Sequence, residues 1–544
     1  MTAAGPSGGR AAAALLSGTA LALCLPKPGL NFLGWFALAP LFAALDEASA
    51  RRGAVLGFLA GFAYHATALN WIYWTCRFAH VSRFVGLVAL FALAAFLALS
   101  WSTIGLFGSW ALRGLPLWLK PWSWAAAWTA MSYLWNSRTP RLAADFLAYS
   151  QWRHPALFQM DAILGPYGLG AIILAINAGL GILWNHARRR GGARWGSLLA
   201  TTLGPAVIFL ALGAFWGQSQ LARRDRFLTS KPSLTATAVI LQPDIDQYHK
   251  WDDAYRKENA RILASLVSQA FALNPSLVLW PESSIPFAVD ETIGRLDLPH
   301  TGRGRGQRPS ALRAVGKGFG PAGRGSRSKG DQLVGAISYL QDSDGVEFYN
   351  AALLVSPAGS VVGRYHKRRL VPFGEFVPLK FLKRFIGILN TFGDLTPGER
   401  DQPLLKTAVG LVAVTICYEA AFPELARFDA ARGARIIANL TNDGWYKDSW
   451  GPYQHFGTNV FRAVENRVYV LRSANTGISA AIDPWGLPMA RLGLGQRGDI
   501  SAEIPAADPF PARSFYARHG DWLAGLCLLA AAGFGLMNAV RSRA

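Results

Sequence analysis

Long apolar runs are the feature that most restricts what this chain can fold into. Seven of them occur before residue 217, and an eighth lies near the C-terminus. Hydrophobic residues make up 51% of the 544 residues, which is more than an ordinary soluble enzyme contains. Because a helix needs about 20 apolar residues to cross a bilayer, the runs predict a multi-pass membrane domain with about eight transmembrane helices. Their approximate positions are 11–25, 30–46, 54–76, 84–111, 121–137, 161–185, 196–217 and 521–540.

Basic residues flank these runs, and the chain has a net charge of +21. A membrane protein with basic loops beside anionic lipids explains this charge better than nucleic-acid binding does. One set of alternate loops and the two ends carry most of it: Arg10, Arg51, Arg52, Arg113, Lys120, Arg188, Arg189, Arg190, Arg194, Arg541 and Arg543. The opposite loops carry Lys27, Arg77, Arg83 and Arg138. The positive-inside rule therefore predicts cytoplasmic ends, with the long stretch between spans seven and eight on the periplasmic face of a bacterial inner membrane.

The chain is expected to divide into three parts. Residues 1–217 form an N-terminal membrane domain with about seven spans, 218–510 a catalytic domain, and 511–544 a last transmembrane helix with a cytoplasmic tail. In the middle part strand patterns alternate with helical ones, which is typical of an α/β layered domain. The expected strands cover 235–241, 277–280, 332–337, 351–355, 360–364, 410–416, 436–440 and 478–482, and the expected helices about 252–273, 420–432 and 453–471.

Two segments of the middle part differ from this pattern. Residues 302–330 are rich in Gly, Arg and Ser, which predicts a solvated surface insert, with contact to anionic headgroups as the alternative. The insert lacks the interleaved aromatic residues of a nucleic-acid binder. At 379–392, apolar residues recur at helical spacing among Lys380, Lys383 and Arg384. This pattern favours either an amphipathic lid in the membrane interface or an ordinary helix that faces the core.

Cysteine is scarce, with residues at positions 24, 76, 417 and 527 only. Three of them lie in or beside apolar runs, so we expect no disulfide framework and no metal cluster. We also expect that the protein uses no cofactor. Cys417 follows the apolar segment 412–416 and precedes Tyr418 and Glu419. A thiol at the end of a buried strand, beside a carboxylate, favours a nucleophile. A buried structural cysteine is the alternative, because a free thiol also behaves as a small hydrophobic group.

Two further polar clusters occur in the same domain. Glu282 follows an apolar strand and a proline in the segment 279–284, so we expect its carboxylate at a strand end. The second cluster, 365–375, contains Lys367 and Glu375. Each cluster alone is a weak signal, since a charged residue at a strand end is usually solvated. Their occurrence with Cys417 in one α/β domain indicates a common site.

The three clusters together resemble a known family. WPES at 280–283, KRRLVPFGEFVP at 367–378 and ICYEAAFPE at 416–424 are similar to motifs of the nitrilase, or carbon–nitrogen hydrolase, superfamily, and within it of the apolipoprotein N-acyltransferase family. The resemblance covers essentially the whole chain, with the insert 302–330 as a departure between motifs. It implies an αββα nitrilase-like sandwich on an eight-helix membrane domain. Further matching segments are 149–151, 165–168, 250–252, 442–446, 451–455 and 475–478.

The resemblance also implies roles for individual residues. Cys417 is the expected nucleophile, Glu282 the general base and Lys367 the cation that stabilises charge. Since a thiol has an unperturbed pKa of ~8.5, it needs such partners to attack an ester at neutral pH. Four more residues are expected to bind substrate or support the triad, with a purely structural role as the alternative for each: Trp251, Glu375, Tyr418 and Glu419.

The reaction implied by the resemblance has two half-reactions. Cys417 first attacks an acyl ester of a membrane phospholipid, which leaves a thioester and releases a lysophospholipid. The N-terminal amine of the S-diacylglyceryl-cysteine of an apolipoprotein then attacks the thioester, which produces a triacylated lipoprotein. The expected partners are thus a phospholipid acyl donor, a diacylated apolipoprotein acceptor and the lipid bilayer, without nucleic acid, and the expected state is a monomer.

Two other functions fit parts of the sequence. A membrane-tethered amidase or nitrilase would hydrolyse a C–N bond with the same triad, but the membrane half and the apolar segment 379–392 argue against it. A protein that binds lipid or a partner without catalysis would be expected to lack a triad residue. Glu282, Lys367 and Cys417 are all present.

Overall fold

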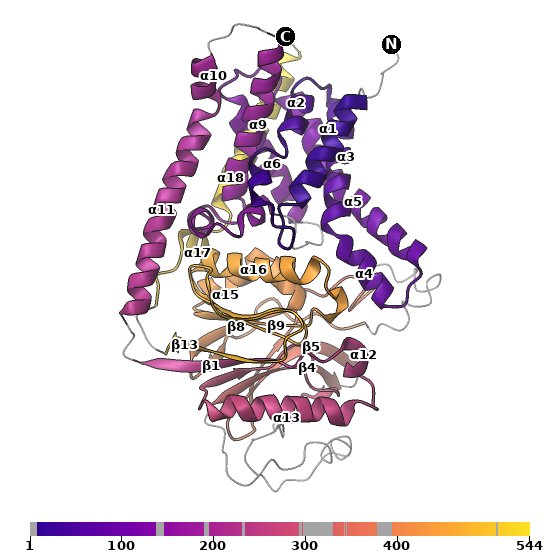
Figure 1. Ribbon diagram of the computed structural model, residues 1–544, viewed down its shortest axis with the longest axis vertical. Coiled ribbons are helices and arrows are strands. Elements are labelled where there is room, and N and C mark those ends of the chain that lie inside the picture. Colours follow the sequence, from indigo (N-terminus) through magenta and orange to yellow (C-terminus); the bar gives the residue numbers. More distant parts are fainter. Residues whose placement is uncertain are drawn as a thin grey trace. The chain divides into compact units, whose positions relative to one another are not determined.

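The computed structural model shows two compact units (Figure 1). It describes residues 8–137, 146–189, 195–230, 234–292, 296, 330–341, 343, 345–377, 394–506 and 510–543. The first unit comprises Met1–Leu228, Tyr446–Glu465 and Ser514–Ala544. The second comprises Thr229–Trp445 and Asn466–Arg513. The insert predicted at 302–330, apart from Gly330, and the lid or core helix predicted at 379–392 lie outside the described residues.

The first unit is helical in its described part. Its elements are α1 (Gly8–Ala22), η1 (Asn31–Trp35), α2 (Ala39–Asp46), α3 (Ala50–Ala68), α4 (Asn70–Phe78), α5 (Arg83–Ala111), α6 (Lys120–Asn136), η2 (Leu147–Gln151), α7 (Pro155–Phe158), α8 (Asp161–Leu164), α9 (Gly168–Arg189), α10 (Trp195–Thr202), α11 (Gly204–Thr229), α16 (Gly451–Asn466), α17 (Phe515–His519) and α18 (Trp522–Arg541). Every apolar run predicted to span the membrane therefore contains helix.

Fewer of these helices than expected have the length of a membrane span. In the described part of the chain, α5, α9, α11 and α18 are long and apolar enough to cross a membrane. The pair α3 and α4 qualifies as one further span, bent by 44°. The run predicted at 30–46 is divided between η1 and α2, and α1 has only 15 residues. A membrane domain with several apolar helices is thus confirmed, whereas the number eight stays a prediction.

Small residues allow α3 and α5 to pack closely. A Cβ atom added to Gly57 would lie 2.1 Å from the carbonyl oxygen of Trp101, and one added to Gly105 would lie 2.1 Å from that of Gly53. Only glycine fits at these positions without a shift of the backbone. Such contacts are typical of helix pairs in membranes, where close van der Waals packing replaces the hydrophobic effect as the main attraction.

Basic residues from distant loops meet at one end of the first unit. Arg10 and Arg189 both pair with Glu47, and Lys120 pairs with Asp46. Arg113 donates a hydrogen bond to the carbonyl oxygen of Ala48. The structure therefore gathers four of the residues that the charge pattern assigned to one side of the membrane.

Helix α16 belongs to the first unit, although it lies within the stretch 218–510 expected to form the catalytic domain. Gln454 donates a hydrogen bond to the carbonyl oxygen of Ala68, and Arg462 donates one to the hydroxyl of Tyr149. These buried polar contacts, which the sequence pattern does not reveal, explain the assignment. The helix predicted at 453–471 is too long: it ends at Asn466, and Arg467 has a φ of 56° that interrupts helical geometry.

The second unit contains two β-sheets. The seven-stranded sheet has the order β13-β1-β2-β4-β5-β6, with β3 beside β4, and the six-stranded sheet has the order β12-β11-β10-β9-β8-β7. Five strands were not predicted (β3, β7, β10, β12 and β13). The strands are β1 (Thr235–Gln242), β2 (Leu277–Leu279), β3 (Val289–Asp290), β4 (Asp331–Gln341), β5 (Val346–Val355), β6 (Val361–His366), β7 (Leu405–Thr407), β8 (Gly410–Ile416), β9 (Ile436–Thr441), β10 (Tyr469–Ala474), β11 (Ser479–Ile482), β12 (Pro488–Leu492) and β13 (Gly498–Pro505).

Side chains that alternate along the strands form the layers of this unit. Ala238 and Ile240 of β1 pack into the core between the sheets, where they join Val414 and Ile416 of β8. Val239 of β1 points the other way, into a core that includes residues of helix α13 (Arg256–Ala272). Helix α15 (Pro423–Ala431) packs against β8 of the other sheet. The result is the predicted αββα sandwich, with α13 and α15 as outer layers (Figure 1).

Candidate active site

Cys417 occupies a turn at the end of strand β8, which lies next to the edge strand β7 of its sheet. The strand pairs in parallel with β9, and Cys417 begins the short 3-10 helix η5 (Cys417–Ala421). Its φ of 50° lies in the left-handed region, which is uncommon for a residue with a side chain. Strained backbone of this kind persists where the surrounding structure enforces it, and it is frequent at active sites. The abrupt end of the apolar strand, recognised in the sequence, therefore coincides with a strained turn.

Glu282 lies at the end of β2, as expected. The strand ends at Leu279, and the next residues of the chain, Trp280 to Ser283, form a tight turn in which Ser283 has a φ of 50°. Gly335 of the neighbouring strand β4 makes room for this turn. A Cβ at that position would lie 2.3 Å from the carbonyl oxygen of Pro281 and 2.7 Å from the Cα of Glu282. The glycine thus allows the turn that carries Glu282 to lie directly on the sheet.

Lys367 directly follows strand β6 and is almost completely buried. Its Nζ atom lies 2.8 Å from Oε1 of Glu375 and 3.5 Å from Oε1 of Glu282. Burial by itself would lower the pKa of Lys367, but the charges of Glu375 and Glu282 outweigh it and raise the pKa above its usual value. Lys367 therefore stays positively charged throughout the physiological range.

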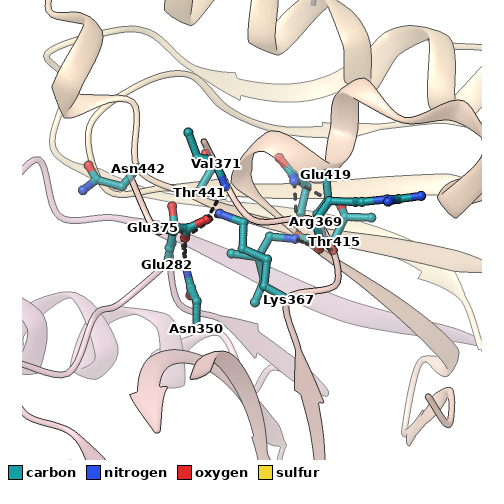
Figure 2. A network of polar contacts seen from close by, with 12 residues as sticks. Glu282, Asn350, Lys367, Arg369, Val371, Glu375, Thr415, Glu419, Thr441 and Asn442 are labelled. Carbon is teal, nitrogen blue, oxygen red and sulfur yellow. Dashed lines mark hydrogen bonds and ion pairs between the residues drawn. The ribbon is translucent and has the colours of Figure 1, made fainter. Parts of the chain in front are cut away.

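Asn350 of β5 connects the two carboxylates. Its Nδ2 atom donates hydrogen bonds of 2.7 Å to Oε1 of Glu282 and to Oε1 of Glu375. The amide N–H of Val371 donates to the other oxygen of Glu375. Figure 2 shows the side chains of Glu282, Glu375, Lys367 and Asn350 converging on one point. Asn350 was missed in the sequence, where its only signal is a polar residue within the buried strand segment 349–355.

The thiol of Cys417 is buried among charged groups. Burial, followed by the charge of Glu282, raises the pKa of the thiol to about 12, while Lys367 and a hydrogen bond with Thr441 act in the opposite direction. Cys417 is therefore a neutral thiol near pH 7. A base must remove its proton during attack, and Glu282 is close enough to influence its charge.

Glu419 joins two loops of the site through its hydrogen bonds. Its Oε2 accepts hydrogen bonds from the amide of Ile416 and the hydroxyl of Tyr365. Its Oε1 accepts from the amides of Arg368 and Arg369. The side chain is fully buried, and burial raises the pKa of its carboxyl group. The geometry therefore favours a supporting role, in which Glu419 holds the nucleophile turn against the segment after Lys367.

The other two candidate residues are more exposed. Trp251 is 46% exposed and directly follows the short helix α12 (Gln247–Lys250). Tyr418 is half-buried and makes an edge contact with Phe422, at a ring distance of 4.9 Å. Both side chains have surface available for a substrate.

The site has the parts needed for acyl transfer through a thiol. It combines a neutral thiol, a carboxylate that can accept the proton and a permanent cation that can stabilise a tetrahedral oxyanion. Among the described residues, the structure has no cluster of three or more His, Cys, Asp or Glu that could hold a metal ion.

Comparisons with known proteins agree with this architecture. A family described as carbon-nitrogen hydrolase matches residues 237–509, and one described as apolipoprotein N-acyltransferase N-terminal domain matches residues 17–179. The αββα sandwich is therefore a carbon–nitrogen hydrolase fold.

Relatives match over nearly the full length. An apolipoprotein N-acyltransferase of Geobacter metallireducens is 31% identical over 95% of this chain and 93% of the relative. One of Caulobacter vibrioides is 30% identical over 91% and 88%, respectively. Among solved structures, Saccharomyces cerevisiae Nit3 of the nitrilase superfamily is 20% identical, with a TM-score of 0.35 over 50% of this chain and 91% of that chain.

Proposed function

This chain belongs to the apolipoprotein N-acyltransferase family, and from that premise we propose how it carries out lipoprotein N-acylation. The enzyme transfers an acyl chain from a membrane phospholipid to the N-terminal amine of a diacylated apolipoprotein. Transfer proceeds in two steps through a thioester on Cys417. The observation that carries this proposal is the convergence of Glu282 and Lys367 on the strained turn of a buried thiol.

In the first step, Glu282 removes the proton from the Cys417 thiol as the sulfur attacks the ester carbon. The charge of Lys367 stabilises the oxyanion that forms, and Glu282 returns the proton to the lysophospholipid as it leaves. In the second step, the amine of the acceptor attacks the thioester, and the thiol is restored. Asn350 and Glu375 position the two charged partners through the hydrogen bonds described above.

The membrane helices would hold the active site close to the bilayer that contains both substrates. Both substrates are lipids anchored in a bilayer, and a membrane-bound enzyme meets them at high effective concentration. We propose that the catalytic domain lies on the periplasmic face of the inner membrane, in line with the basic residues gathered around Asp46 and Glu47.

Intact mass spectrometry of the purified enzyme after incubation with phospholipid tests the proposal. We expect a fatty-acyl mass increment on the wild type and on Cys527→Ala, a matched control that removes a buried cysteine elsewhere. The increment should be absent from Cys417→Ala and should be lost on addition of a diacylated lipopeptide. Loss of the increment to water alone at the same rate would indicate a lipid hydrolase. Absence of any increment, together with ammonia release from small amides, would favour an amidase.

A further inference from the structure

A second lysine, Lys250, lies beside the catalytic triad. It ends helix α12, which begins after Asp246, whose carboxylate accepts a hydrogen bond from the amide of Tyr248. Lys250 is 6% exposed, and its Nζ donates a hydrogen bond of 2.9 Å to the main-chain oxygen of Glu282. The same atom lies 6.0 Å from the ring centre of Trp251. Lys250 thus adjoins both the general base and an exposed aromatic residue that we expect to contact substrate.

The two lysines of the site differ in their partners. Lys367 is paired with two carboxylates and remains charged. For Lys250, the described part of the chain provides a carbonyl oxygen as hydrogen-bond partner and no carboxylate at ion-pair distance. Burial lowers the pKa of Lys250 to about 8, although the charges of Glu282 and Cys417 oppose this shift. A general base works best when its pKa is close to the working pH, and Lys250 meets this condition.

The charged groups around Lys250 come from several elements. Glu282 faces it from the turn after β2, and Cys417 faces it from the end of β8. The charge of Lys367 lowers the pKa of the Cys417 thiol, and the charge of Asp443 raises it. Because the Cys417 thiol is neutral near pH 7 and becomes a neutral thioester, Glu282 is the negative group that acts on Lys250 before and after acylation.

The two half-reactions differ in their proton balance. Formation of the thioester moves one proton from the thiol to the departing alcohol, through Glu282, and releases none. The acceptor amine, in contrast, arrives mostly as an ammonium group near neutral pH, since an α-amine has a pKa of about 7.7–8.0. It loses two protons when it becomes an amide, and only one returns to the sulfur. The second half-reaction therefore needs a further proton acceptor in addition to Glu282.

We propose that Lys250 is the proton acceptor that activates the amine of the diacylated lipoprotein in the second half-reaction. This inference rests on the proposed function. Uncharged Lys250 takes one proton from the ammonium group, and the free amine uses its lone pair to form a bond to the thioester carbon. The C–S bond breaks with its electron pair on sulfur. Glu282 transfers the second amine proton to that sulfur, and Lys250 later releases its proton to water.

Two substitutions separate this role from a structural one. Lys250→Arg keeps a positive charge and hydrogen-bond donors for Glu282, but an arginine cannot act as a base near neutral pH. Lys250→Met removes both functions while the unbranched chain is retained. Lys257→Met, which changes an exposed lysine on α13, is the matched control. The acyl mass increment on Cys417 reports for each variant whether the first half-reaction, and hence the fold of the site, is intact.

The decisive measurement is the rate at which the acyl-enzyme is discharged. At pH 7 about a tenth of the acceptor amine is already uncharged, so with a diacylated lipopeptide we expect discharge of both Lys250 variants to be slower by about tenfold. Their acylation should stay within about threefold of the wild type. With hydroxylamine, which is uncharged at neutral pH, discharge should match the wild type. The deficit with lipopeptide should also shrink as the pH rises and the amine loses its own proton.

Contrary results would be equally clear. If Lys250→Arg discharges to the lipopeptide at the wild-type rate, or if the deficit is the same with hydroxylamine and at every pH, then Lys250 only positions Glu282. If the variants lose acylation as strongly as discharge, the inference is also wrong. If the wild type itself forms no acyl-enzyme, the proposed function fails, and the inference fails with it.

Discussion

At the scale of single residues, the site depends on how burial and charge set protonation. Lys367 and Lys250 are the same residue type in one site, yet their pKa values move in opposite directions. The difference arises because Lys367 has two carboxylate partners, whereas Lys250 has a carbonyl oxygen. Burial also keeps the Cys417 thiol neutral, so the nucleophilic attack that we propose requires a base, the role that we assign to Glu282. The protonation states of three side chains thus follow from their immediate surroundings.

The raised pKa of Cys417 predicts the pH dependence of its alkylation. In a Glu282→Gln variant, which lacks the base, only the thiolate form reacts with iodoacetamide. A raised pKa means that this form is a small fraction that grows tenfold per pH unit, so the logarithm of the rate should rise with unit slope from about pH 6 to pH 9. The rate is measured by mass spectrometry, with Cys417→Ala as the blank. A plateau near pH 7 would show that the thiolate is stabilised rather than disfavoured.

At the scale of secondary-structure elements, the site is formed where strands end. The ends of β2, β6 and β8 supply Glu282, Lys367 and Cys417, and β5 supplies Asn350. Glu419 joins two of these elements, because it accepts hydrogen bonds from the end of β8 and from the segment after β6. The turn after β8 therefore depends on a residue two positions from the nucleophile.

Substitution of Glu419 should consequently destabilise the second unit. Glu419→Ala leaves three amide N–H groups and the Tyr365 hydroxyl without their acceptor in a buried position. Each unsatisfied buried group costs about 1–3 kcal/mol, and local rearrangement recovers part of this cost. We therefore expect the free energy of unfolding to fall by about 3 kcal/mol. The apparent Tm should fall by about 6–12 °C, and alkylation of Cys417 should change as the turn loosens. Glu424→Ala in the first turn of α15 is the control, with an expected change below about 1 kcal/mol. A similar Tm for both variants would refute the role of Glu419.

At the scale of the whole molecule, charge predicts orientation. The structure brings Arg10, Arg113, Lys120 and Arg189 to one end of the first unit, and a Cβ at Gly114 would lie 3.7 Å from the guanidinium of Arg541. Short loops that are rich in lysine and arginine lie on the cytoplasmic side of the membrane. The C-terminal tail and the catalytic unit should therefore be accessible from opposite sides of the membrane.

Labelling of single cysteines tests this orientation. Lys406→Cys introduces an exposed thiol into the second unit, and Ser542→Cys introduces one into the C-terminal tail. We expect a membrane-impermeant maleimide to label the former in intact spheroplasts and the latter only after permeabilisation. The parent protein gives the background from its own four cysteines. Labelling of Ser542→Cys in intact spheroplasts would reverse the assigned orientation.

Local patterns in the sequence determined the fold class and the core of the site. Apolar runs predicted the helical unit, and alternating strand and helix patterns predicted an α/β layered domain. The resemblance to the nitrilase superfamily then implied the αββα sandwich. The expected strand at Gly410–Ile416 has the same bounds in the structure. Glu282, Lys367 and Cys417 were predicted as site residues because their three motifs together resemble those of the nitrilase superfamily. These signals are local, so the linear sequence retains them.

Only the tertiary structure decided features that depend on residues distant in the chain. Asn350 belongs to no motif that the sequence reveals. It is part of the site because its side chain donates hydrogen bonds to two carboxylates from other segments of the chain. Helix α16 joined the first unit through Gln454 and Arg462, whose partners Ala68 and Tyr149 precede them by more than 300 residues. The different protonation of Lys250 and Lys367 likewise follows from burial and neighbouring charge. These properties arise from long-range proximity, which no local pattern of residues encodes.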